Sequence, residues 1–331
     1  MTCQHWAVMP DPQRPDVSVA VSTYNRARLL PRLLDALSKQ SLPYDHFEVV
    51  VVDDCSPDDT PTVLQELEHH VSFALRVIRL EQNAGPAKGR NVAWGACHGD
   101  VIAFTDDDCQ PTERWLENGL RAIDKPGICV VVGKTAPNPD QLSNLGAFSR
   151  TLWVNNARFF QTCNTFYRRA DLEAVGGLDE TFPSPGGEDT DLGWRVCALR
   201  GEAAFSEGAL VYHDVRPSDF RATVRETLRW DGVPHVIAKH GSRARHVLFR
   251  RLFWKRTHPR LIFAVAGMIL ARIHPIALVL CVPWIALRMI RRPGLERWPT
   301  RIGALPGLFV IDLLEIFVMV RGSVRHKTIV L

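Results

Sequence analysis

Short acidic runs in the first two thirds of this 331-residue chain have the residue types of a metal or phosphate site. Asp106, Asp107 and Asp108 are three consecutive carboxylates, which repel one another unless a positive charge lies among them. Carboxylate oxygens suit a hard divalent cation, and Mg²⁺ or Mn²⁺ bound there would also bridge to substrate phosphates. The run therefore predicts a divalent-cation site that faces a phosphorylated substrate.

Two further acidic pairs have more than one interpretation. Asp53 and Asp54 precede Cys55 and Ser56, and Asp after a strand is also common in turns and helix caps. Glu188 and Asp189 follow two glycines, where a helix is predicted to begin. There the two carboxylates either stabilise the helix start, by about 0.3–1 kcal/mol, or supply a general base at the edge of a loop.

A glycine turn at Gly85 opens a predicted helix that carries Lys88 and Arg90 in its first turns. Free N–H groups and the helix dipole attract anions to a helix start, and two cations add to this attraction. The segment is neither a GxGxxG fingerprint nor a P-loop. It predicts a phosphate-binding helix start; the alternative is a surface helix with solvated basic side chains.

The elements that must position these residues follow from two alternating periodicities. Apolar runs predict strands at residues 17–21, 49–52, 75–80, 101–105 and 128–132, with helical patterns between them. Such alternation is typical of βαβ units and a mainly parallel sheet, in which ligands bind beyond the carboxyl ends of the strands. Because residues 53–54 and 106–108 follow predicted strands, we expect them at one edge of the sheet.

Composition divides the chain into unlike parts. The formal net charge is +4, but residues 1–215 hold 19 basic and 30 acidic side chains and residues 216–331 hold 21 and 6, giving −11 and +15. We predict a tail at 1–15, a catalytic domain at 16–215, a basic helical linker at 216–258 and an apolar, basic helical region at 259–331. A near-neutral total disfavours nucleic acid as a partner.

The last third has the pattern of a membrane-associated region. Residues 219–239 predict one helix with a stripe of Arg221, Arg225 and Arg229. Residues 261–287 are apolar, but Arg272 in their middle would cost roughly 2.5–3.5 kcal/mol in a bilayer, so two halves in a re-entrant or interfacial hairpin fit better. In the apolar stretch 303–320 the two acidic side chains need partners, and Arg272 or another basic residue is expected to pair with Asp312 and Glu315.

Flanking arginines and tryptophans favour anionic lipid at the cytoplasmic face of a membrane as the partner of these helices, and a soluble helical bundle is the alternative. The eight cysteines include no CxxC pair, and the first sixteen residues have no apolar core of a signal peptide. We therefore expect free thiols in a reducing compartment and no structural zinc.

Five motifs in order resemble those of family 2 glycosyltransferases, which are inverting enzymes of the GT-A fold. The motifs are Val17 to Arg26, Val52-Asp53-Asp54-Cys55-Ser56, Asn83-x-Gly85 to Arg90-Asn91, Asp106-x-Asp108 and Gly187-Glu188-Asp189. The match covers about residues 16–215. It implies an α/β GT-A domain, Rossmann-like with a mainly parallel central sheet flanked by helices, ahead of the C-terminal α-helical membrane-associated segment.

The resemblance assigns residues to the nucleotide. Asp54, with Asp53 beside it, matches the acidic residue that recognises the base and ribose of the donor. The loop after the first strand would line the nucleotide pocket with Thr23, Tyr24 and Arg26.

The resemblance also assigns residues to the sugar diphosphate. Gly85 and Arg90 would lie near the diphosphate. Asp106 and Asp108 would hold the metal on it and contact the sugar, with Asp107 also in the donor site.

Catalysis is assigned to the later motif. Asp189 matches the general base, with Glu188 beside it. His213 stands where some members of the family place a further metal ligand, although a lone His that ends an apolar strand is as often structural. Aromatic residues between 134 and 167 either stack on acceptor sugars or belong to the core: Trp153, Phe159, Phe160, Phe166 and Tyr167.

The expected function is transfer of a sugar from a nucleotide-diphosphate sugar to a hydroxyl of a lipid-linked or cell-envelope glycan acceptor. UDP is the preferred nucleotide, with dTDP or GDP as alternatives. A base removes the acceptor proton while the diphosphate leaves from the other face of the sugar. A nucleotidyltransferase is disfavoured because a glycine-rich triphosphate loop is absent, and a catalytically silent nucleotide-sugar-binding scaffold is disfavoured because metal and base positions are intact.

Overall fold

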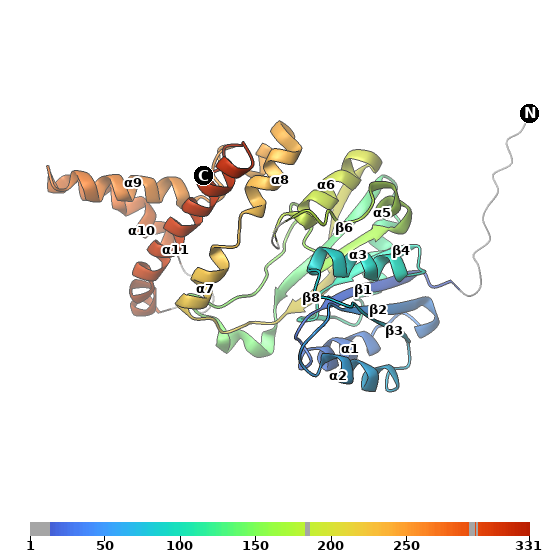
Figure 1. Cartoon of the computed structure of the whole chain (residues 1–331). Helices are drawn as coiled ribbons and strands as arrows, with labels where there is room; N and C mark the ends of the chain where they lie inside the picture. The colour runs from blue at the N-terminus through green and yellow to red at the C-terminus, as the bar shows by residue number, and fades with distance from the viewer. Residues whose placement is uncertain (1–13, 183–185, 291–294, 296) are drawn as a thin grey trace, which may run out of the picture. The chain divides into compact units, whose positions relative to one another are not determined.

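The computed structural model describes residues 14–182, 186–290, 295 and 297–331, so most of the predicted tail lies outside the described residues. The chain forms two compact units (Figure 1). The first comprises residues 14–134, 162–177 and 196–211, and the second comprises 135–161, 178–195 and 212–331.

In the part of the chain that the structure describes, eight strands form one sheet in the order β3-β2-β1-β4-β7-β6-β8-β5. The strands are β1 (Val17–Thr23), β2 (Phe47–Asp53), β3 (Ala74–Arg79), β4 (Val101–Thr105), β5 (Cys109–Pro111), β6 (Ile128–Pro137), β7 (Asn164–Arg168) and β8 (Glu202–His213). The pairs β1–β2, β2–β3 and β1–β4 are parallel, whereas β4–β7 and β6–β7 are antiparallel. All five predicted strands are confirmed, but the parallel arrangement found for β1, β2, β3 and β4 is interrupted at β7, which is antiparallel to both of its neighbours.

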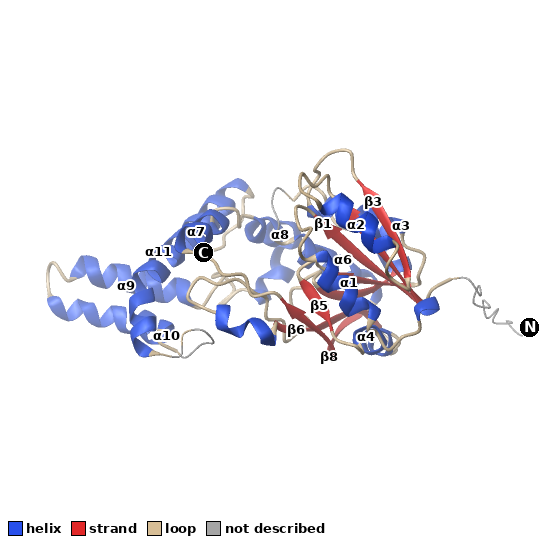
Figure 2. Ribbon diagram, turned by 90° about the horizontal axis from the view of Figure 1, so that it is seen from below, coloured by secondary structure: helices blue, strands red, loops and turns tan. Residues whose placement is uncertain are grey.

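Helices cover both faces of the sheet in the first unit (Figure 2). They are α1 (Leu30–Ser38), α2 (Thr60–Glu68), α3 (Pro86–Ala96), α4 (Trp115–Ile123) and α5 (Arg169–Val175), with a 3₁₀ turn η1 (Tyr44–His46). Every residue of β2 is buried, as expected for a strand covered on both sides. Leu29, Leu33 and Leu37 have the spacing of one helix face, which predicts a buried stripe, and in α1 Leu33 and Leu37 are buried.

The second unit contains helices in place of one long predicted helix. The elements are η2 (Pro139–Asn144), α6 (Glu188–Arg200), which ends in the first unit, α7 (Phe220–Thr227), α8 (Gly232–His240) and η3 (Gly241–Val247). The prediction of one helix over 219–239 is wrong. Pro234 has no N–H group, and its ring would clash with the carbonyl four residues earlier in a continuous helix. Arg229 consequently lies beyond the end of α7 and leaves the predicted stripe.

The start of α6 agrees with its prediction. The helical spacing of Leu192, Val196 and Leu199 also predicts a buried apolar stripe, which does not run the full length of the helix. Leu192 and Val196 are fully buried, whereas Leu199 is 52% exposed. Leu199 is wrongly predicted because the last turn of the helix is not covered on that side.

The C-terminal residues form a helical bundle of α9 (Thr257–Leu270), the 3₁₀ helix η4 (Pro275–Cys281), α10 (Val282–Arg288) and α11 (Trp298–Arg325). The predicted division of residues 261–287 into two halves is confirmed, because α9 and η4 form a hairpin with its turn at Arg272 (Figure 2). Gly267 permits this close packing, since a Cβ atom there would lie 2.7 Å from the carbonyl oxygen of Ala277. Among the described residues, α11 alone is long and apolar enough to cross a membrane by length and composition.

Both acidic side chains of α11 have partners inside the bundle. The carboxylate of Asp312 is fully buried and accepts hydrogen bonds from Trp284 Nε1 (2.8 Å) and Arg288 Nε (3.0 Å). Glu315 pairs with Lys255 Nζ at 2.6 Å and His258 Nε2 at 3.2 Å. The expectation of basic partners is confirmed, but Arg272 is not one of them, because it lies exposed at the hairpin turn.

Candidate active site

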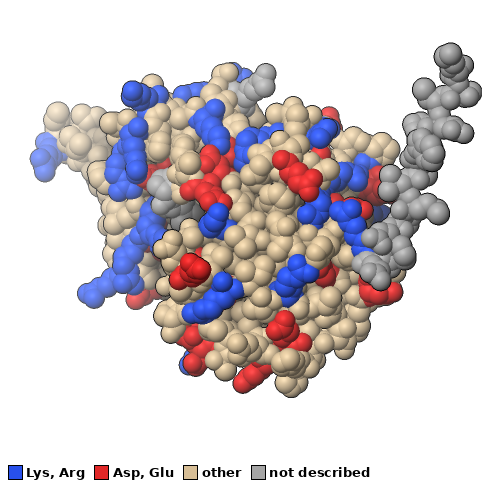
Figure 3. Space-filling model, turned by 45° about the vertical axis from the view of Figure 1, so that its right-hand side comes forward, with Lys and Arg blue, Asp and Glu red and all other residues tan. Residues whose placement is uncertain are grey.

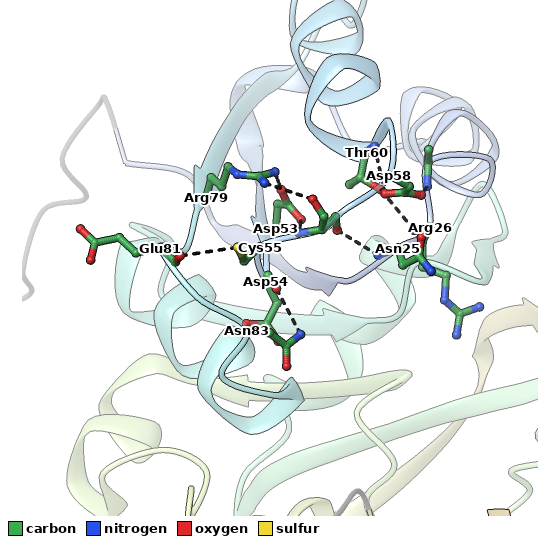
Figure 4. Close-up of polar contacts among 12 residues, drawn as sticks. Asn25, Arg26, Asp53, Asp54, Cys55, Asp58, Thr60, Arg79, Glu81 and Asn83 are labelled. Atoms are coloured by element: carbon green, nitrogen blue, oxygen red, sulfur yellow. Dashed lines mark hydrogen bonds and ion pairs between the residues drawn. The ribbon is translucent and has the colours of Figure 1, made fainter. Parts of the chain in front are cut away.

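Asp53, at the end of β2, organises the loop that follows it (Figure 4). Its Oδ1 accepts the backbone N–H of Ser56 at 2.9 Å, and its Oδ2 forms an ion pair with Arg79. The turn chemistry considered for this pair is therefore present. Sequence reasoning missed Arg79, which is paired with Asp53 in the register of the parallel strands β2 and β3.

Asp54 joins the acidic loop to the glycine turn of α3 (Figure 4). Its two carboxylate oxygens accept backbone N–H groups from Ala84 (2.7 Å) and Gly85 (2.8 Å), and its carbonyl oxygen accepts from Asn83 Nδ2 (3.2 Å). Gly85 has φ +89° and ψ 166°, a conformation that is essentially restricted to glycine. Two features that the sequence presents thirty residues apart thus form one structure at the start of α3.

The loop after β1 is held by the loop after β2. The N–H of Asn25 donates to Ser56 Oγ at 2.9 Å, and the N–H of Arg26 donates to Thr60 Oγ1 at 3.2 Å (Figure 4). Burial would raise the pKa of Asp58, but hydrogen bonds from the Thr60 hydroxyl and from backbone N–H groups hold it below its usual value. The backbone is fixed while the Tyr24 ring stays exposed, as stacking on a ligand requires.

The carboxylate run lies in the turn between β4 and β5. Arg90 Nη2, on α3, binds Asp106 Oδ1 at 2.8 Å, so one predicted positive charge among the carboxylates is a guanidinium. Thr23 Oγ1 donates to Asp107 Oδ2 at 2.7 Å, and Asp107 and Asp108 are both buried. Carboxylate oxygens are the hard donors that Mg²⁺ or Mn²⁺ takes, so Asp106 and Asp108 fit a divalent cation.

Charge on the molecular surface is mixed. Figure 3 shows Lys and Arg (blue) and Asp and Glu (red) on the face drawn, with wide areas of uncharged surface between them. Acidic side chains are common on the surface, so the carboxylates of the candidate site differ from the others by their burial and by their hydrogen-bond and ion-pair partners.

Glu188 and Asp189 begin α6 in the second unit and differ in environment. Glu188 is buried, and its Oε2 accepts the N–H of Gly186 at 2.6 Å, which is the stabilising role considered for a carboxylate at this helix start. Asp189 is half-buried. Asp189 is therefore the more accessible of the two carboxylates.

Asp191, which sequence reasoning missed, is the centre of a buried charge cluster. Its carboxylate binds Arg195 Nε (2.8 Å), Lys239 Nζ (2.9 Å) and His240 Nε2 (2.8 Å). Burial would raise the pKa of Asp191, but hydrogen bonds from His240 and Lys239 and the charge of Arg195 hold it below its usual value. The i, i+4 spacing of Asp191 and Arg195 was a visible signal. The cluster ties the helix that carries Asp189 to α8.

His213 ends β8 and is buried. Its Nδ1 lies 2.8 Å from the carbonyl oxygen of Asp214. A carbonyl oxygen can only accept, so Nδ1 carries a proton, and in the neutral imidazole Nε2 would be the acceptor nitrogen. This is the arrangement found in metal-binding histidines, and it is compatible with a structural role as well.

The candidate acceptor aromatics divide between core and surface. Phe166 and Tyr167 in β7 are fully buried, Phe160 is buried, and Phe159 packs against the apolar core of the second unit. Trp153 is exposed. Trp153 is therefore the most open of these rings, Phe159 is half-buried, and the core interpretation holds for Phe160, Phe166 and Tyr167.

Two family models match the chain. The model described as glycosyl transferase family 2 matches residues 18–176, and the model described as glycosyl transferase family group 2 matches residues 101–290. The second match covers more than half of the chain and includes much of the C-terminal helical region.

Curated relatives are similar over part of their length. Glycosyltransferase AglE of Haloferax volcanii is 27% identical over 212 residues, which are 61% of this chain and 68% of AglE. Poly(ribitol-phosphate) beta-N-acetylglucosaminyltransferase TarS of Staphylococcus aureus is 39% identical over 109 residues, which are 33% of this chain and 19% of TarS. The matched part is therefore only a fraction of the larger relative.

Solved structures show the same fold. Mannosyltransferase PcManGT from Pyrobaculum calidifontis, in complex with GDP-Man and Mn²⁺, has a TM-score of 0.61 at 23% identity, covering 96% of this chain and 90% of that one. Residues 1–349 of S. aureus TarS in complex with UDP have a TM-score of 0.51 at 21% identity, covering 95% and 92%. The predicted GT-A fold is confirmed.

Proposed function

The chain belongs to glycosyltransferase family 2 and is a glycosyltransferase, and from this premise we propose that it transfers a sugar with inversion from a nucleotide-diphosphate sugar to a hydroxyl of a lipid-linked or cell-envelope glycan. The observation that carries the proposal is the interlocked donor site of the first unit. There the loops after β1, β2 and β4 and the start of α3 meet at the carboxyl ends of parallel strands, through Asp54 and Arg90. This is where ligands bind in open α/β sheets.

Donor binding follows from the chemistry of these loops. The rigid loop from Thr23 to Arg26 presents Tyr24 to the nucleotide, and Asp53 and Asp54 shape the base and ribose side. Arg90, on the first turns of α3, adds a cation to a helix start that favours phosphate. UDP is the proposed nucleotide, since the TarS structure contains UDP; GDP, present with PcManGT, and dTDP are the alternatives.

Asp106 and Asp108 would hold the divalent cation, Mg²⁺ or Mn²⁺, and His213 Nε2 is proposed as a further ligand; PcManGT was solved with Mn²⁺. When bound, the cation neutralises charge that builds on the leaving diphosphate. Asp107, held by Thr23, keeps the turn between β4 and β5 in place.

Asp189 is the proposed general base, with Glu188 holding the glycine turn beside it. Asp189 would accept the proton of the acceptor hydroxyl as that oxygen attacks the anomeric carbon, a contribution of about 10²–10⁴-fold to the rate. The Asp191 cluster fixes the helix on which this carboxylate lies.

Metal-dependent release of nucleoside diphosphate from a panel of nucleotide sugars, with a glycan or lipid-linked acceptor, tests the proposed function. We expect release that stops with EDTA and in the double variant D106A/D108A, while Asp35→Asn, an exposed carboxylate on α1, leaves it unchanged. Pyrophosphate release from a nucleoside triphosphate would instead indicate a nucleotidyltransferase. Donor binding without any turnover would indicate a scaffold.

We further propose that the α9–η4 hairpin attaches the enzyme to anionic lipid at the cytoplasmic face of the membrane. Its outer side chains are apolar and exposed, with Ile273 at the turn 84% exposed, while the ion pairs of Asp312 and Glu315 occupy the inside of the bundle. Basic residues near the base of the hairpin, among them Arg256 and Arg260, complement anionic headgroups.

Co-flotation with vesicles tests the attachment. The full chain should float with phosphatidylglycerol vesicles, and with phosphatidylcholine vesicles far less. Ile273→Asp should weaken flotation, whereas Leu142→Asp, an equally drastic change at an exposed leucine outside the hairpin, should not. Equal flotation of both variants would contradict the assignment of the hairpin.

A further inference from the structure

Two thiols of the first unit lie within contact distance on different elements. The Sγ atoms of Cys129, in β6, and Cys197, in the last turn of α6, are 3.8 Å apart. A disulfide has an S–S bond of about 2.05 Å, so the sulfurs would need to approach by less than about 2 Å. The seven cysteines of the described residues are free thiols, as predicted.

Backbone contacts hold the segments that carry these two thiols next to each other. The N–H of Glu202, just after α6, donates to the carbonyl oxygen of Gly127, just before β6, at 3.0 Å. Gly201 has φ +147°, and a Cβ atom there would lie 2.5 Å from the same oxygen. The end of α6 is therefore clamped to the start of β6, next to both cysteines.

One of the two cysteines, Cys129, lines a pocket. An open depression of about 450 Å³ is lined by Lys125, Gly127, Cys129, Arg168, Asp171 and Arg200, among others. Cys129 is buried, at 2% exposed, whereas Cys197 is half-buried. Two cations are fixed in the wall, since Arg168 Nη2 donates to the carbonyl oxygen of Ile123 at 2.6 Å and Arg200 Nε pairs with Asp171 at 3.0 Å. Three basic side chains (Lys125, Arg168 and Arg200) and two acidic ones (Asp124 and Asp171) line the pocket, and this net positive charge suits a small anionic reagent.

The pair is also polarised in favour of one thiolate. A hydrogen bond from the Cys197 thiol, with a smaller effect of the Arg168 charge, lowers the pKa of Cys129, although burial and the charge of Asp171 oppose it. The thiolate is the nucleophile in disulfide exchange. Cys129, which lines the pocket, is thus the attacking sulfur, and Cys197 is the resolving one.

We propose that Cys129 and Cys197 form a redox-active dithiol that exchanges with low-molecular-weight disulfides carrying carboxylates, of the glutathione disulfide class. The Cys129 thiolate attacks one sulfur of the reagent, whose S–S bond breaks and releases one thiolate, which takes up a proton. The Cys197 thiol loses its proton to solvent, and its sulfur attacks Cys129 of the mixed disulfide and releases the second thiolate. Two protein thiols are oxidised by two electrons, and one reagent disulfide is reduced to two thiols.

The same unit contains a comparison pair. Cys109 and Cys163 interact through their thiols, and each is 1% exposed, but neither lines the pocket. Burial raises the pKa of Cys109 well above its ordinary value. If proximity were sufficient, both pairs would form disulfides. Because Cys129 lines the pocket and has a lowered pKa, we expect the disulfide only between Cys129 and Cys197.

The full chain is equilibrated with mixtures of glutathione and glutathione disulfide, alkylated with N-ethylmaleimide and analysed by peptide mass spectrometry. We expect a Cys129–Cys197 disulfide at reagent ratios that leave Cys109 and Cys163 alkylated. Cys197→Ser should accumulate glutathione on Cys129, Cys129→Ser should abolish the intramolecular product, and Cys281→Ser should react like the parent chain. Circular dichroism shows whether each variant is folded.

Alkylation of Cys129 and Cys197 to the same extent as Cys109 and Cys163 across all ratios would overturn the proposal. A Cys197→Ser protein that is folded and takes up no glutathione on Cys129 would also overturn it. The readout is independent of glycosyl transfer, so the outcome does not depend on the proposed function.

Discussion

The buried pair of Arg288 and Asp312 permits a quantitative test of how the C-terminal bundle is held together. Asp312 is fully buried and is bonded to Trp284 Nε1 and to two nitrogens of Arg288. Arg288→Met keeps most of the side-chain length and removes the charge, which leaves a buried carboxylate with only an indole N–H. Removing one partner of a buried ion pair costs about 3–5 kcal/mol.

The double variant R288M/D312N separates the loss of the pair from the cost of the stranded charge. It removes both charges, and the amide oxygen of the introduced asparagine can still accept the Trp284 N–H. The remaining cost is that of an imperfectly satisfied buried amide, about 1–3 kcal/mol. The double variant should therefore be more stable than Arg288→Met alone, because the stranded charge is gone.

The assay is guanidinium unfolding of the full chain, followed by tryptophan fluorescence and far-ultraviolet circular dichroism. The control is Arg272→Met, at the exposed hairpin turn, which should change the unfolding free energy by no more than about 0.5 kcal/mol and show no coupling to D312N. A loss below about 1 kcal/mol for Arg288→Met would refute the reasoning. Measurable coupling between Arg272 and Asp312 would refute the pairing itself.

Three further predictions concern residues of the first and second units. Asp189→Asn should lower the transfer rate by about 10²–10⁴-fold while donor affinity measured by calorimetry is retained; turnover near that of the parent chain would exclude Asp189 as the base. Gly85→Ala should destabilise the fold by about 1–3 kcal/mol and weaken donor binding, because a φ of +89° is strained for alanine. No atom lies within 4 Å of the added Cβ, so the cost comes from the backbone and not from a clash. The control is Gly95→Ala, in α3, where the Cβ is equally free of neighbours and φ is not positive. The rings of His235 and His326 stack with centroids 4.4 Å apart, and burial lowers the pKa of both imidazoles. As the pH falls, these imidazoles take up protons in the unfolded chain before they do so in the folded one. The free energy of unfolding should therefore be at its full value above about pH 6.5 and decrease as the pH drops below it. A melting temperature that falls as much in H326N as in the parent chain between pH 7 and 5.5 would contradict this.

Local patterns were sufficient where neighbouring residues decide the structure. The continuous apolar run of β2 and the leucine spacing of α1 predicted their elements, because burial of a strand or helix face repeats with the period of that element. Motif order and residue type likewise indicated the family. The single helix predicted over 219–239 failed at Pro234, a local signal that was overlooked.

The partners of the polar groups were decided by the tertiary structure alone. Asp54 and Gly85, Asp106 and Arg90, Asp191 and Lys239, and Cys129 and Cys197 are each brought together by chain segments distant in sequence or on different elements. Arg272 and Arg288 are equivalent candidates for Asp312 by charge, and only the packing of the hairpin turns one to solvent and the other to the carboxylate. Periodicity reports which face of an element is buried, whereas the identity of a contact depends on how the elements pack, and that is set by the whole chain.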